Sequence, residues 1–506
     1  MYTRQSMTEQ LVGRLREKWE QYKVVIISSL ISAILAYVFI CTNKIPNWDD
    51  MQFLFGKGYT LTSGRWGLDL LEHILPSYSM PWLWGCVSVG LITVATCFVV
   101  NIFQIKNKIF QGMLAALVMV FPSEIGTMLY MFTSSSYAIA FLLAIVAVFL
   151  LEKERLWSKI LAALFVIFAC SIYQAYIAIT ASFLVLLLIH KLSVGGKMPA
   201  FVLKKGCGYL IFLAISLGIY YGITLLLLEV TGNSLNAWAI RATSDTGNIL
   251  YRIYRSWVLF LAAFLKKTYG LVSNNFSLVA HVVCLVCAGA ASLWLVLQQH
   301  NWSKVLLFLV LAGVLLPLSA NCLVLLLGEN GVHALTLYSF ISVYVFIVIV
   351  LDALPEHRVK NLYKDVAAIG LVAVLICNIY SANKAYLKQY LVYENTVSFY
   401  ESIITQVQMT PGFTEETKLA VIGSVPQDSS YLESFGFNTI YGLCGFKGEA
   451  ISDDFITYYL GFDIEYATAE EKQALLNDIR YQEMASYPYY GYVKNIDDYI
   501  VVKLGA

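Results

Sequence analysis

Long apolar runs separated by short polar connections dominate the chain. A helix needs about twenty largely apolar residues to cross the hydrocarbon core of a bilayer, and about eleven runs reach or approach that length. They are 24–41, 82–103, 110–121, 132–151, 160–170, 176–189, 209–228, 278–297, 305–327, 334–354 and 366–380. The pattern predicts an α-helical polytopic membrane protein with about eleven transmembrane helices.

Basic residues gather before the first run and in alternate connections. This distribution agrees with the positive-inside tendency, so we expect the N-terminus to be cytoplasmic. An odd number of spans then places the C-terminus outside the cell membrane, together with residues 42–81, 123–133 and 229–276. The basic residues are Arg14, Arg16, Lys18, Lys23, Lys106, Lys108, Lys153, Arg155, Lys159, Lys191, Lys197, Lys204, Lys205, Lys304, Arg358, Lys360 and Lys364.

Composition supports this class and divides the chain in two. Of the 506 residues, 59% are hydrophobic and only 13% are charged, more apolar surface than a soluble chain of this length can bury. From Leu387 onward there are 7 Lys and Arg against 17 Asp and Glu, although the whole chain has a net charge of +1. We therefore expect a basic transmembrane domain over 1–386 and a small acidic extracytoplasmic domain over 387–506.

The acidic domain has the pattern of a mixed α/β fold. Residues 417–423 and 497–504 have the β-branched, apolar composition of strands. Residues 468–479 begin with a threonine followed three residues later by a glutamate, which is typical of a capped helix.

The first outer loop, 42–81, contains an unusual pair of adjacent carboxylates, Asp49 and Asp50, behind Trp48. Residues 64–75 alternate apolar and charged positions as an amphipathic helix lying in the membrane interface does. Trp48 suits the aromatic belt at headgroup depth. An acidic pair in a loop is also typical of a turn, or of the N-cap of a helix that begins near Met51.

Several short motifs resemble the glucosyltransferase II family, within the GT-C type of polytopic membrane glycosyltransferases. They are WDD (48–50), SGRWG (63–67), FPSE (121–124) and SIYQAYIAI (171–179), and the ending YPYYGYVKNIDDYIVVKL (487–504) is also similar to tails of that group. The resemblance covers most of the membrane part. It implies a GT-C-like fold and transfer of a hexose, with glucose favoured, from a polyprenyl-phosphate donor on the outer face, as in O-antigen modification.

Such a transfer needs a carboxylate to take the proton of the acceptor hydroxyl, and cations or oriented donors to hold the phosphate leaving group. By resemblance, the base is Asp49 or Asp50, and the neighbouring acid positions the loop or binds a cation. Glu124, at an outer turn, is a second catalytic or orienting candidate; an N-cap or a solvated turn acid is the alternative.

The remaining site candidates are cations and aromatic or amide side chains on the same face. Each has a structural alternative: Arg65 snorkelling to headgroups, Arg252 and Arg255 pairing with anionic lipid, or the amide of Gln174 bonding between helices. We expect donor-phosphate binding by Arg65, Arg252, Arg255 and Lys266, and substrate contacts by Trp48, Trp66, Tyr173, Gln174 and His333.

Three functions remain open at this point. The first is a membrane glycosyltransferase with a lipid-linked sugar donor and a polysaccharide or glycan acceptor; the others are a flippase or exporter of a lipid-linked glycan, and a polysaccharide polymerase or ligase. Ionisable residues lie mostly at span ends, which favours chemistry at the outer surface over transport. No nucleotide-binding or metal-ligand motif is present, so we expect no cofactor, with a cation at Asp49 and Asp50 as the alternative, and no nucleic-acid partner.

Overall fold

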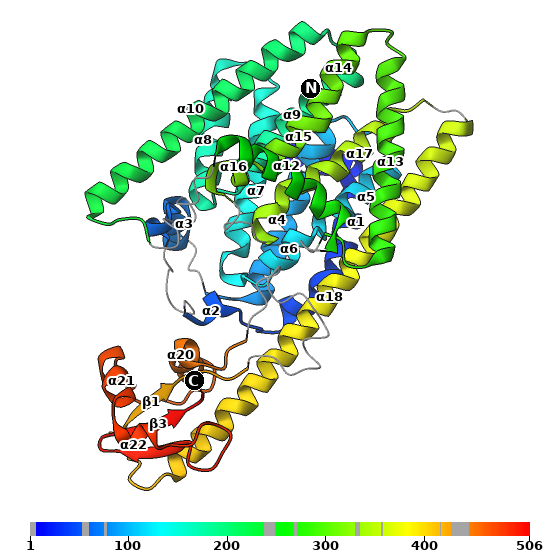
Figure 1. The fold of residues 1–506 in the computed structure, drawn as a ribbon. Coiled ribbons are helices and arrows are strands. Elements are labelled where there is room, and N and C mark those ends of the chain that lie inside the picture. Colours follow the sequence, from blue (N-terminus) through cyan, green and yellow to red (C-terminus); the bar gives the residue numbers. More distant parts are fainter. Residues whose placement is uncertain are drawn as a thin grey trace. The chain divides into compact units, whose positions relative to one another are not determined.

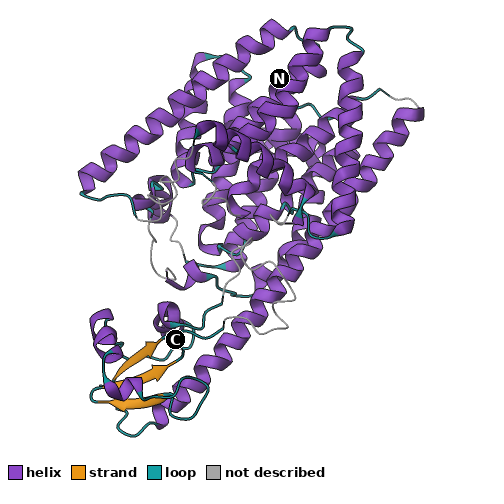
Figure 2. Cartoon of the chain, in the orientation of Figure 1, coloured by secondary structure: helices purple, strands orange, loops and turns teal. Residues whose placement is uncertain are grey.

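The computed structural model describes residues 7–52, 60–74, 78–236, 248–267, 271–328, 334–355, 358–414, 416–426 and 445–505, and it is mostly helical (Figure 2). The chain divides into two compact units. Unit 1 comprises Met1–Thr42, Tyr59–Pro76 and Met80–Asn383, and unit 2 comprises Asn43–Gly58, Ser77–Ser79 and Lys384–Ala506. The described part of the first outer loop is therefore split, since residues 43–52 and 78–79 belong with the C-terminal unit and not with the transmembrane domain.

Unit 1 is a helical bundle, in which the neighbouring helices α4, α7 and α8 make the most extensive contacts. Figure 1 shows its elements in chain order. They are α1 (Met7–Thr42), η1 (Leu61–Ser63), α3 (Trp66–Ile74), α4 (Pro81–Ile102), α5 (Lys108–Met119), α6 (Pro122–Thr127), α7 (Met131–Leu151), α8 (Leu156–Ile172), α9 (Tyr176–Ser193), α10 (Pro199–Thr231), α12 (Ile249–Leu265), α13 (Asn275–Leu297), α14 (Trp302–Val310), η3 (Leu311–Leu315), α15 (Leu316–Ala320), α16 (Cys322–Leu327), η5 (Ala334–Ile341), α17 (Ser342–Ala353) and the first half of α18 (Arg358–Met409).

Ten helical segments within the described residues are long and apolar enough to cross a membrane, which confirms the predicted class of polytopic membrane protein. The eleventh expected run lies in α8, which is shorter. The ten segments are Val12–Thr42, Pro81–Ile102, Lys108–Thr127, Met131–Leu151, Tyr176–Ser193, Pro199–Thr231, Asn275–Leu297, Trp302–Ala320, Ala334–Ala353 and Asn361–Met409.

The run 305–327 is not one straight helix, and the reason lies in Pro317. A proline has no amide hydrogen and its ring displaces the carbonyl four residues earlier, here that of Gly313. The chain accordingly forms the π-helical turn η3 just before Pro317. The indole Nε1 of Trp257, on α12, donates to the freed Gly313 carbonyl at 2.8 Å.

Helix α12 also forms hydrogen bonds with the second interruption of this run, which lies between α15 and α16. Asn321 donates its amide to the carbonyl of Ser256 at 2.9 Å, and the Ser256 hydroxyl donates to the carbonyl of Asn321 at 2.8 Å. Arg252 donates through Nη1 to the carbonyl of Leu325 at 2.9 Å. The amphipathic helix α12 therefore supplies hydrogen-bond donors to backbone carbonyls that a broken membrane helix leaves open.

Unit 2 contains the second half of α18, so the boundary between the units falls inside a continuous helix of 52 residues. The other elements are α2 (Trp48–Gln52), β1 (Lys418–Ile422), α20 (Glu449–Tyr458), α21 (Ala469–Leu476), α22 (Ile479–Gln482), β2 (Val493–Ile496) and β3 (Tyr499–Lys503). The small C-terminal sheet that the sequence predicts is present, with strand order β1-β3-β2. Strand β3 pairs parallel with β1 and antiparallel with β2.

Two features explain why this unit folds as it does. Strands β1 and β3 are buried at their centres, and Leu419, Val421, Ile500 and Val502 form one core with Phe399, Phe446 and Phe455. The helix α21 starts with a capping box, in which Thr468 accepts from the backbone of Glu471 and Glu471 accepts from the backbone of Thr468. Met51 of α2 is fully buried in the same core.

Candidate functional site

The motifs SGRWG (63–67) and SIYQAYIAI (171–179) are more than a hundred residues apart in the sequence, but they contact each other in unit 1. The amide Nε2 of Gln174, in the second motif, donates to the carbonyl of Ser63, in the first, at 2.8 Å and to the hydroxyl of Tyr220 at 3.0 Å. Tyr220 in turn donates to the carbonyl of Gly64 at 2.9 Å. Gln174, an expected substrate contact, is therefore engaged in holding the first outer loop against α10.

The two glycines of SGRWG meet physical limits at this contact. Gly64 has a φ of 74°, in the left-handed region, and a Cβ there would lie 3.0 Å from both Gln174 Nε2 and Tyr220 Oη. A Cβ on Gly67 would lie 2.0 Å from the hydroxyl oxygen and 3.1 Å from the backbone carbonyl carbon of Ser171. Only glycine lets α3 pack this closely on α8.

Arg65, between these glycines, lies over an aromatic cluster. Its guanidinium carbon is 4.8 Å from the ring centroid of Tyr173, within the range of a cation–π contact. Tyr173 stacks on Tyr137 with centroids 4.9 Å apart, and it meets Tyr176 edge-on at 6.2 Å. Tyr137 and Tyr176 were not singled out from the sequence, because a tyrosine in an apolar run carries no local signal for a site.

Glu124 lies near Tyr176, another member of the same aromatic cluster. It is in the first turn of the short helix α6, only 1% exposed, and its Oε1 atom has no hydrogen-bond partner among the described residues. Its carboxylate is close enough to Tyr176 and Tyr338 to interact electrostatically with both. A solvated turn acid would be exposed, so that alternative is wrong for Glu124. A cation, a set of tyrosines and a buried carboxylate thus meet in unit 1.

Trp66 begins α3 and fixes that helix to two neighbours. Its indole Nε1 donates to Thr224 Oγ1 on α10 at 3.2 Å, and its ring lies 6.4 Å from that of Phe168 on α8. The side chain is half-buried.

In unit 2, the carboxylate pair sits in the first turn of α2, where the two side chains have different surroundings. Asp50 is fully buried, and Asp49 is half-buried. The backbone amide of Asp50 donates to the side chain of Asn47 at 2.9 Å. Helix α2 therefore begins at Trp48 and not near Met51, because Asn47, and neither aspartate, acts as the capping residue.

Lys44, Ser79 and Tyr459 surround Asp50, and none of them was identified from the sequence. Lys44 Nζ lies 3.3 Å from Asp50 Oδ2, 3.1 Å from Ser79 Oγ and 5.6 Å from the ring centroid of Tyr459. Asp50 Oδ1 and the Tyr459 hydroxyl are buried without a hydrogen-bond partner among the described residues. Lys44 was the only one of the three near enough in sequence to be suspected, because Ser79 and Tyr459 come from remote segments.

Burial controls the protonation of this group. Removal from water raises the pKa of Asp50, and the neighbouring Lys44 ammonium, the Ser79 hydroxyl and the backbone amide oppose the rise. Burial and the Asp50 carboxylate both raise the pKa of Tyr459. Trp48 packs at the edge of the unit 2 core.

The remaining predicted cations lie on or after α12. Arg252 is engaged with the Leu325 carbonyl, and Arg255 is half-buried one turn further along the same helix. Lys266 is exposed at the C-cap of α12. His333 lies outside the described residues. No group of three or more His, Cys, Asp or Glu side chains in the described ranges is arranged to hold a metal ion.

An apolar groove of about 640 Å³ runs between α9, α10 and the broken helix α14–α16. Its walls include Leu184, Leu188, Leu210 and Leu311. One end reaches Leu217, three residues before Tyr220 on α10, and Leu325, whose carbonyl Arg252 contacts. Ile177, three residues after Gln174, lines the same end. The groove thus ends beside the contact between SGRWG and SIYQAY.

The tyrosine-rich turn of unit 2 divides into packed and exposed members. Tyr487 packs edge-on against Phe399 and Tyr492, with centroids 5.1 Å and 5.2 Å away. Tyr489 is 73% exposed and Tyr490 is fully exposed. Packing accounts for the positions of Tyr487 and Tyr492, but not for those of the exposed Tyr489 and Tyr490.

Comparison with protein families matches residues 38–351 to the family described as glucosyl transferase GtrII. Neither the comparison with curated proteins nor that with solved structures finds a match. The matched region spans more than half of the chain and contains every candidate residue of unit 1, together with α2. The chain therefore belongs to the GtrII glucosyl transferase family and is a membrane glycosyltransferase.

Proposed function

We propose that this protein transfers glucose from a polyprenyl-phosphate-linked donor to a glycan acceptor at the outer face of the cell membrane. The observation that carries the proposal is the apolar groove of unit 1, which ends one turn from Gln174 and Tyr220, the two residues that hold the loop carrying Arg65. A polyprenyl chain is a long apolar ligand, and its phosphate is an anion. A groove with apolar walls and an arginine near one end matches both parts of such a donor.

The outer-face assignment follows from the distribution of basic residues along the chain. With a cytoplasmic N-terminus, α2, η1, α3 and unit 2 face the outside. The donor sugar would then be presented where a cell-envelope glycan is available, and no soluble sugar nucleotide is needed.

Within the groove, the proposed roles separate by chemistry. The apolar walls hold the prenyl chain, and Arg65 neutralises the phosphate as its charge increases on leaving. Tyr173 fixes the plane of the Arg65 guanidinium, and Gln174 fixes the loop that carries it. Glu124, buried beside Tyr176, orients the sugar or acceptor through its Oε1 atom.

Asp49 is the proposed general base. A base must reach the hydroxyl whose proton it takes, and Asp49 is half-buried whereas Asp50 is enclosed and paired with Lys44. In the step, the acceptor oxygen bonds to the anomeric carbon while its proton passes to the carboxylate. The bond from that carbon to the phosphate oxygen breaks, and the lipid phosphate leaves. Asp50 positions α2 and thereby its neighbour.

The experiment uses the full-length protein in lipid nanodiscs, polyprenyl-phosphate glucose and a cell-envelope glycan, with glucose incorporation as the readout. We expect Asp49→Asn to reduce kcat by about a thousandfold, within the range of losses that mutagenesis finds for a base or a transition-state contact. Arg65→Gln should raise KM for the donor and lower kcat, and Arg65→Lys should restore part of both. Glu401→Gln, which removes an exposed carboxylate of unit 2, is the matched control and should be neutral.

Two results would refute the proposal. If a well-folded Asp49→Asn variant transfers glucose at the parental rate, Asp49 is not the base. Absence of transfer with any lipid-linked hexose, together with transfer from a soluble sugar nucleotide, would exclude the donor class.

A further inference from the structure

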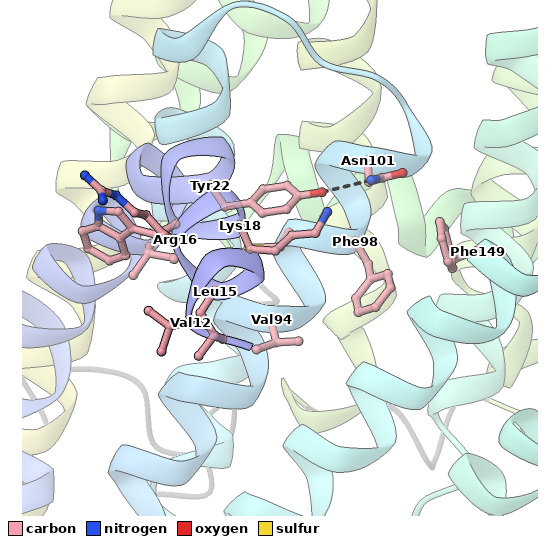
Figure 3. A pocket seen from close by; sticks show the side chains of 12 residues that line it. Val12, Leu15, Arg16, Lys18, Tyr22, Val94, Phe98, Asn101 and Phe149 are labelled. Carbon is pink, nitrogen blue, oxygen red and sulfur yellow. Dashed lines mark hydrogen bonds between the residues drawn. The ribbon is translucent and has the colours of Figure 1, made fainter. Parts of the chain in front are cut away.

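A second apolar cavity lies along the N-terminal half of α1. It has a volume of about 840 Å³ and lies between α1, the last two turns of α4 and Phe149 of α7. Figure 3 shows the side chains that line it. The proposed transfer reaction uses none of them.

The wall that α1 contributes is a regular stripe. Val12, Leu15, Trp19, Tyr22 and Ile26 follow one another at spacings of three and four residues, so they share one face of the helix. Val12, Leu15 and Trp19 are 57%, 60% and 46% exposed. An exposed apolar stripe of this length indicates a partner.

Cations flank the stripe on both sides. Arg16 and Lys18 are two positions apart, hence about 200° apart around the helix, and each borders one edge of the stripe. In Figure 3 the Lys18 side chain extends toward Phe98 and Asn101, whereas Arg16 extends to the opposite side. Neither of them forms an ion pair within the described residues.

A polar network stands at the point where the cavity meets the end of α4. Lys18 donates to the side chain of Gln21 at 3.0 Å, and Gln21 donates to the Tyr22 hydroxyl at 3.1 Å. Asn101 donates to the same hydroxyl at 2.9 Å. Lys108, at the start of α5, donates to the backbone carbonyl of Gln21 at 3.1 Å. Two ammonium groups thus join one network, and none of its members within the described part of the chain is a carboxylate.

The deeper wall is entirely apolar. The hydrogen bond between Asn101 and Tyr22 places these two residues at the same depth along their helices. Cys41 contacts Gly85 near the opposite ends of α1 and α4, which shows that the two helices run antiparallel. Ile26, Val94, Cys97 and Phe98 therefore lie further along the membrane-spanning part of both helices. Phe149 closes this part with an edge-on contact to Phe98 at 5.2 Å.

We propose that this cavity binds one anionic phospholipid, with the phosphate between Lys18 and Lys108 and one acyl chain against Ile26, Val94, Phe98 and Phe149. The site lies on α1, α4, α5 and α7 and shares no lining residue with the groove, so it is a separate lipid site. Tyr22 and Asn101 supply hydrogen-bond groups for the headgroup ester oxygens.

A second copy of the chain is a less suitable occupant. A heptad stripe favours helix pairing, but two parallel copies of α1 would place Lys18 of one copy opposite Lys23 of the other. That repulsion disfavours self-association, whereas the same charges attract an anionic headgroup.

The test compares phospholipids retained by the purified full-length protein after exchange into vesicles of phosphatidylglycerol or of phosphatidylcholine, by native mass spectrometry. Each lysine near an anionic surface contributes about 1 kcal/mol, so Lys18→Gln with Lys108→Gln should weaken phosphatidylglycerol binding by about thirtyfold. Lys159→Gln with Lys204→Gln removes two exposed lysines from α8 and α10 and is the matched control, expected to be unchanged.

A second variant tests the acyl-chain part without a change of charge. Val94 is 46% exposed on the cavity wall, and Val94→Trp should fill the space and lower retention of phosphatidylglycerol by at least about tenfold. Equal losses in both lysine pairs, or equal retention of phosphatidylcholine by the parent, would overturn the proposal. So would disulfide cross-linking between two copies of a Leu15→Cys variant, which would show that a second chain occupies the stripe.

Discussion

The buried pair of Lys44 and Asp50 gives a prediction that depends on which partner is removed. Lys44→Met leaves the Asp50 carboxylate buried without its cation, whereas Asp50→Asn leaves only Lys44, which is 31% exposed and still bonded to Ser79. Breaking a buried pair by removing one partner costs about 3–5 kcal/mol when the remaining charge stays buried. We therefore expect Lys44→Met to weaken the docking of α2 far more than Asp50→Asn does.

The structure also sets an upper limit on that loss. Without Lys44, Asp50 can stay buried by taking up a proton, and at pH 7 this costs at most about 4 kcal/mol from a reference pKa of about 3.9. At pH 5 the same limit is about 1.5 kcal/mol. The sign follows from the raised pKa of Asp50: the folded form holds the proton more readily than the unfolded form, so stability increases as pH falls through the folded pKa and decreases as pH rises.

Hydrogen exchange of the amides of α2, followed by mass spectrometry between pH 5 and pH 8 and corrected for intrinsic rates, measures this opening. Protection in Lys44→Met should be lost at pH 7 to 8 and largely recovered at pH 5, and adding Asp50→Asn should remove the pH dependence. Lys23→Met is the matched control, because its partner Glu20 is 60% exposed although that pair is shorter, at 2.8 Å. Equal effects of the two single variants, or a loss at Lys44→Met that does not shrink at low pH, would refute the reasoning.

Three further predictions concern other parts of the chain. Gly67→Ala should destabilise the protein by about 1–3 kcal/mol through the contact with Ser171, and Ser171→Gly in the same chain should restore part of the thermal stability in detergent; an unaffected single variant would contradict the packing argument. Tyr489→Ala with Tyr490→Ala should raise KM for the glycan acceptor severalfold without changing kcat, since both rings are exposed and an exposed aromatic face can stack on a sugar ring; an unchanged KM would exclude this role. Thr468→Ala should cost about 1 kcal/mol by removing the capping box of α21, measured as the unfolding midpoint of unit 2, and no shift would contradict the capping role.

The sequence predicts the class of this fold well because hydropathy is a local property. Each of the eleven apolar runs is helical over most of its length, although 305–327 is broken into several helical segments, and the predicted strands and capped helix of unit 2 are present. The domain boundary expected between residues 386 and 387 rests on a change in charge. A change in charge does not end the backbone hydrogen bonding of a helix, and α18 continues to Met409. The interruption of 305–327 is foreseeable from Pro317, whereas the hydrogen bonds that Trp257 and Ser256 of α12 donate to its free carbonyls are not.

The candidate site was predictable only in part, for a related reason. Asp49, Asp50, Arg65 and Glu124 stand out because polar residues beside apolar runs are locally conspicuous. Their partners are set by tertiary contacts, and sequence spacing does not reveal that Tyr459 lies near Asp50. Sequence patterns therefore identify most of the charged candidates, together with Trp66 and Tyr173, but they miss Lys44, Tyr137, Tyr176 and Tyr459.

The close fit between SGRWG and SIYQAY has a consequence for engineering. Position 67 has no room for a side chain beside Ser171, and Gln174 donates a hydrogen bond to the carbonyl of Ser63. The two segments therefore have complementary shapes, and a change in one requires a change in the other. A chimera that replaces only the first outer loop with that of another transferase would bring in a loop shaped for a different turn. The smallest segment set to exchange is η1 and α3 together with residues 171–174 and the part of α10 that carries Tyr220 and Thr224, transplanted as one unit.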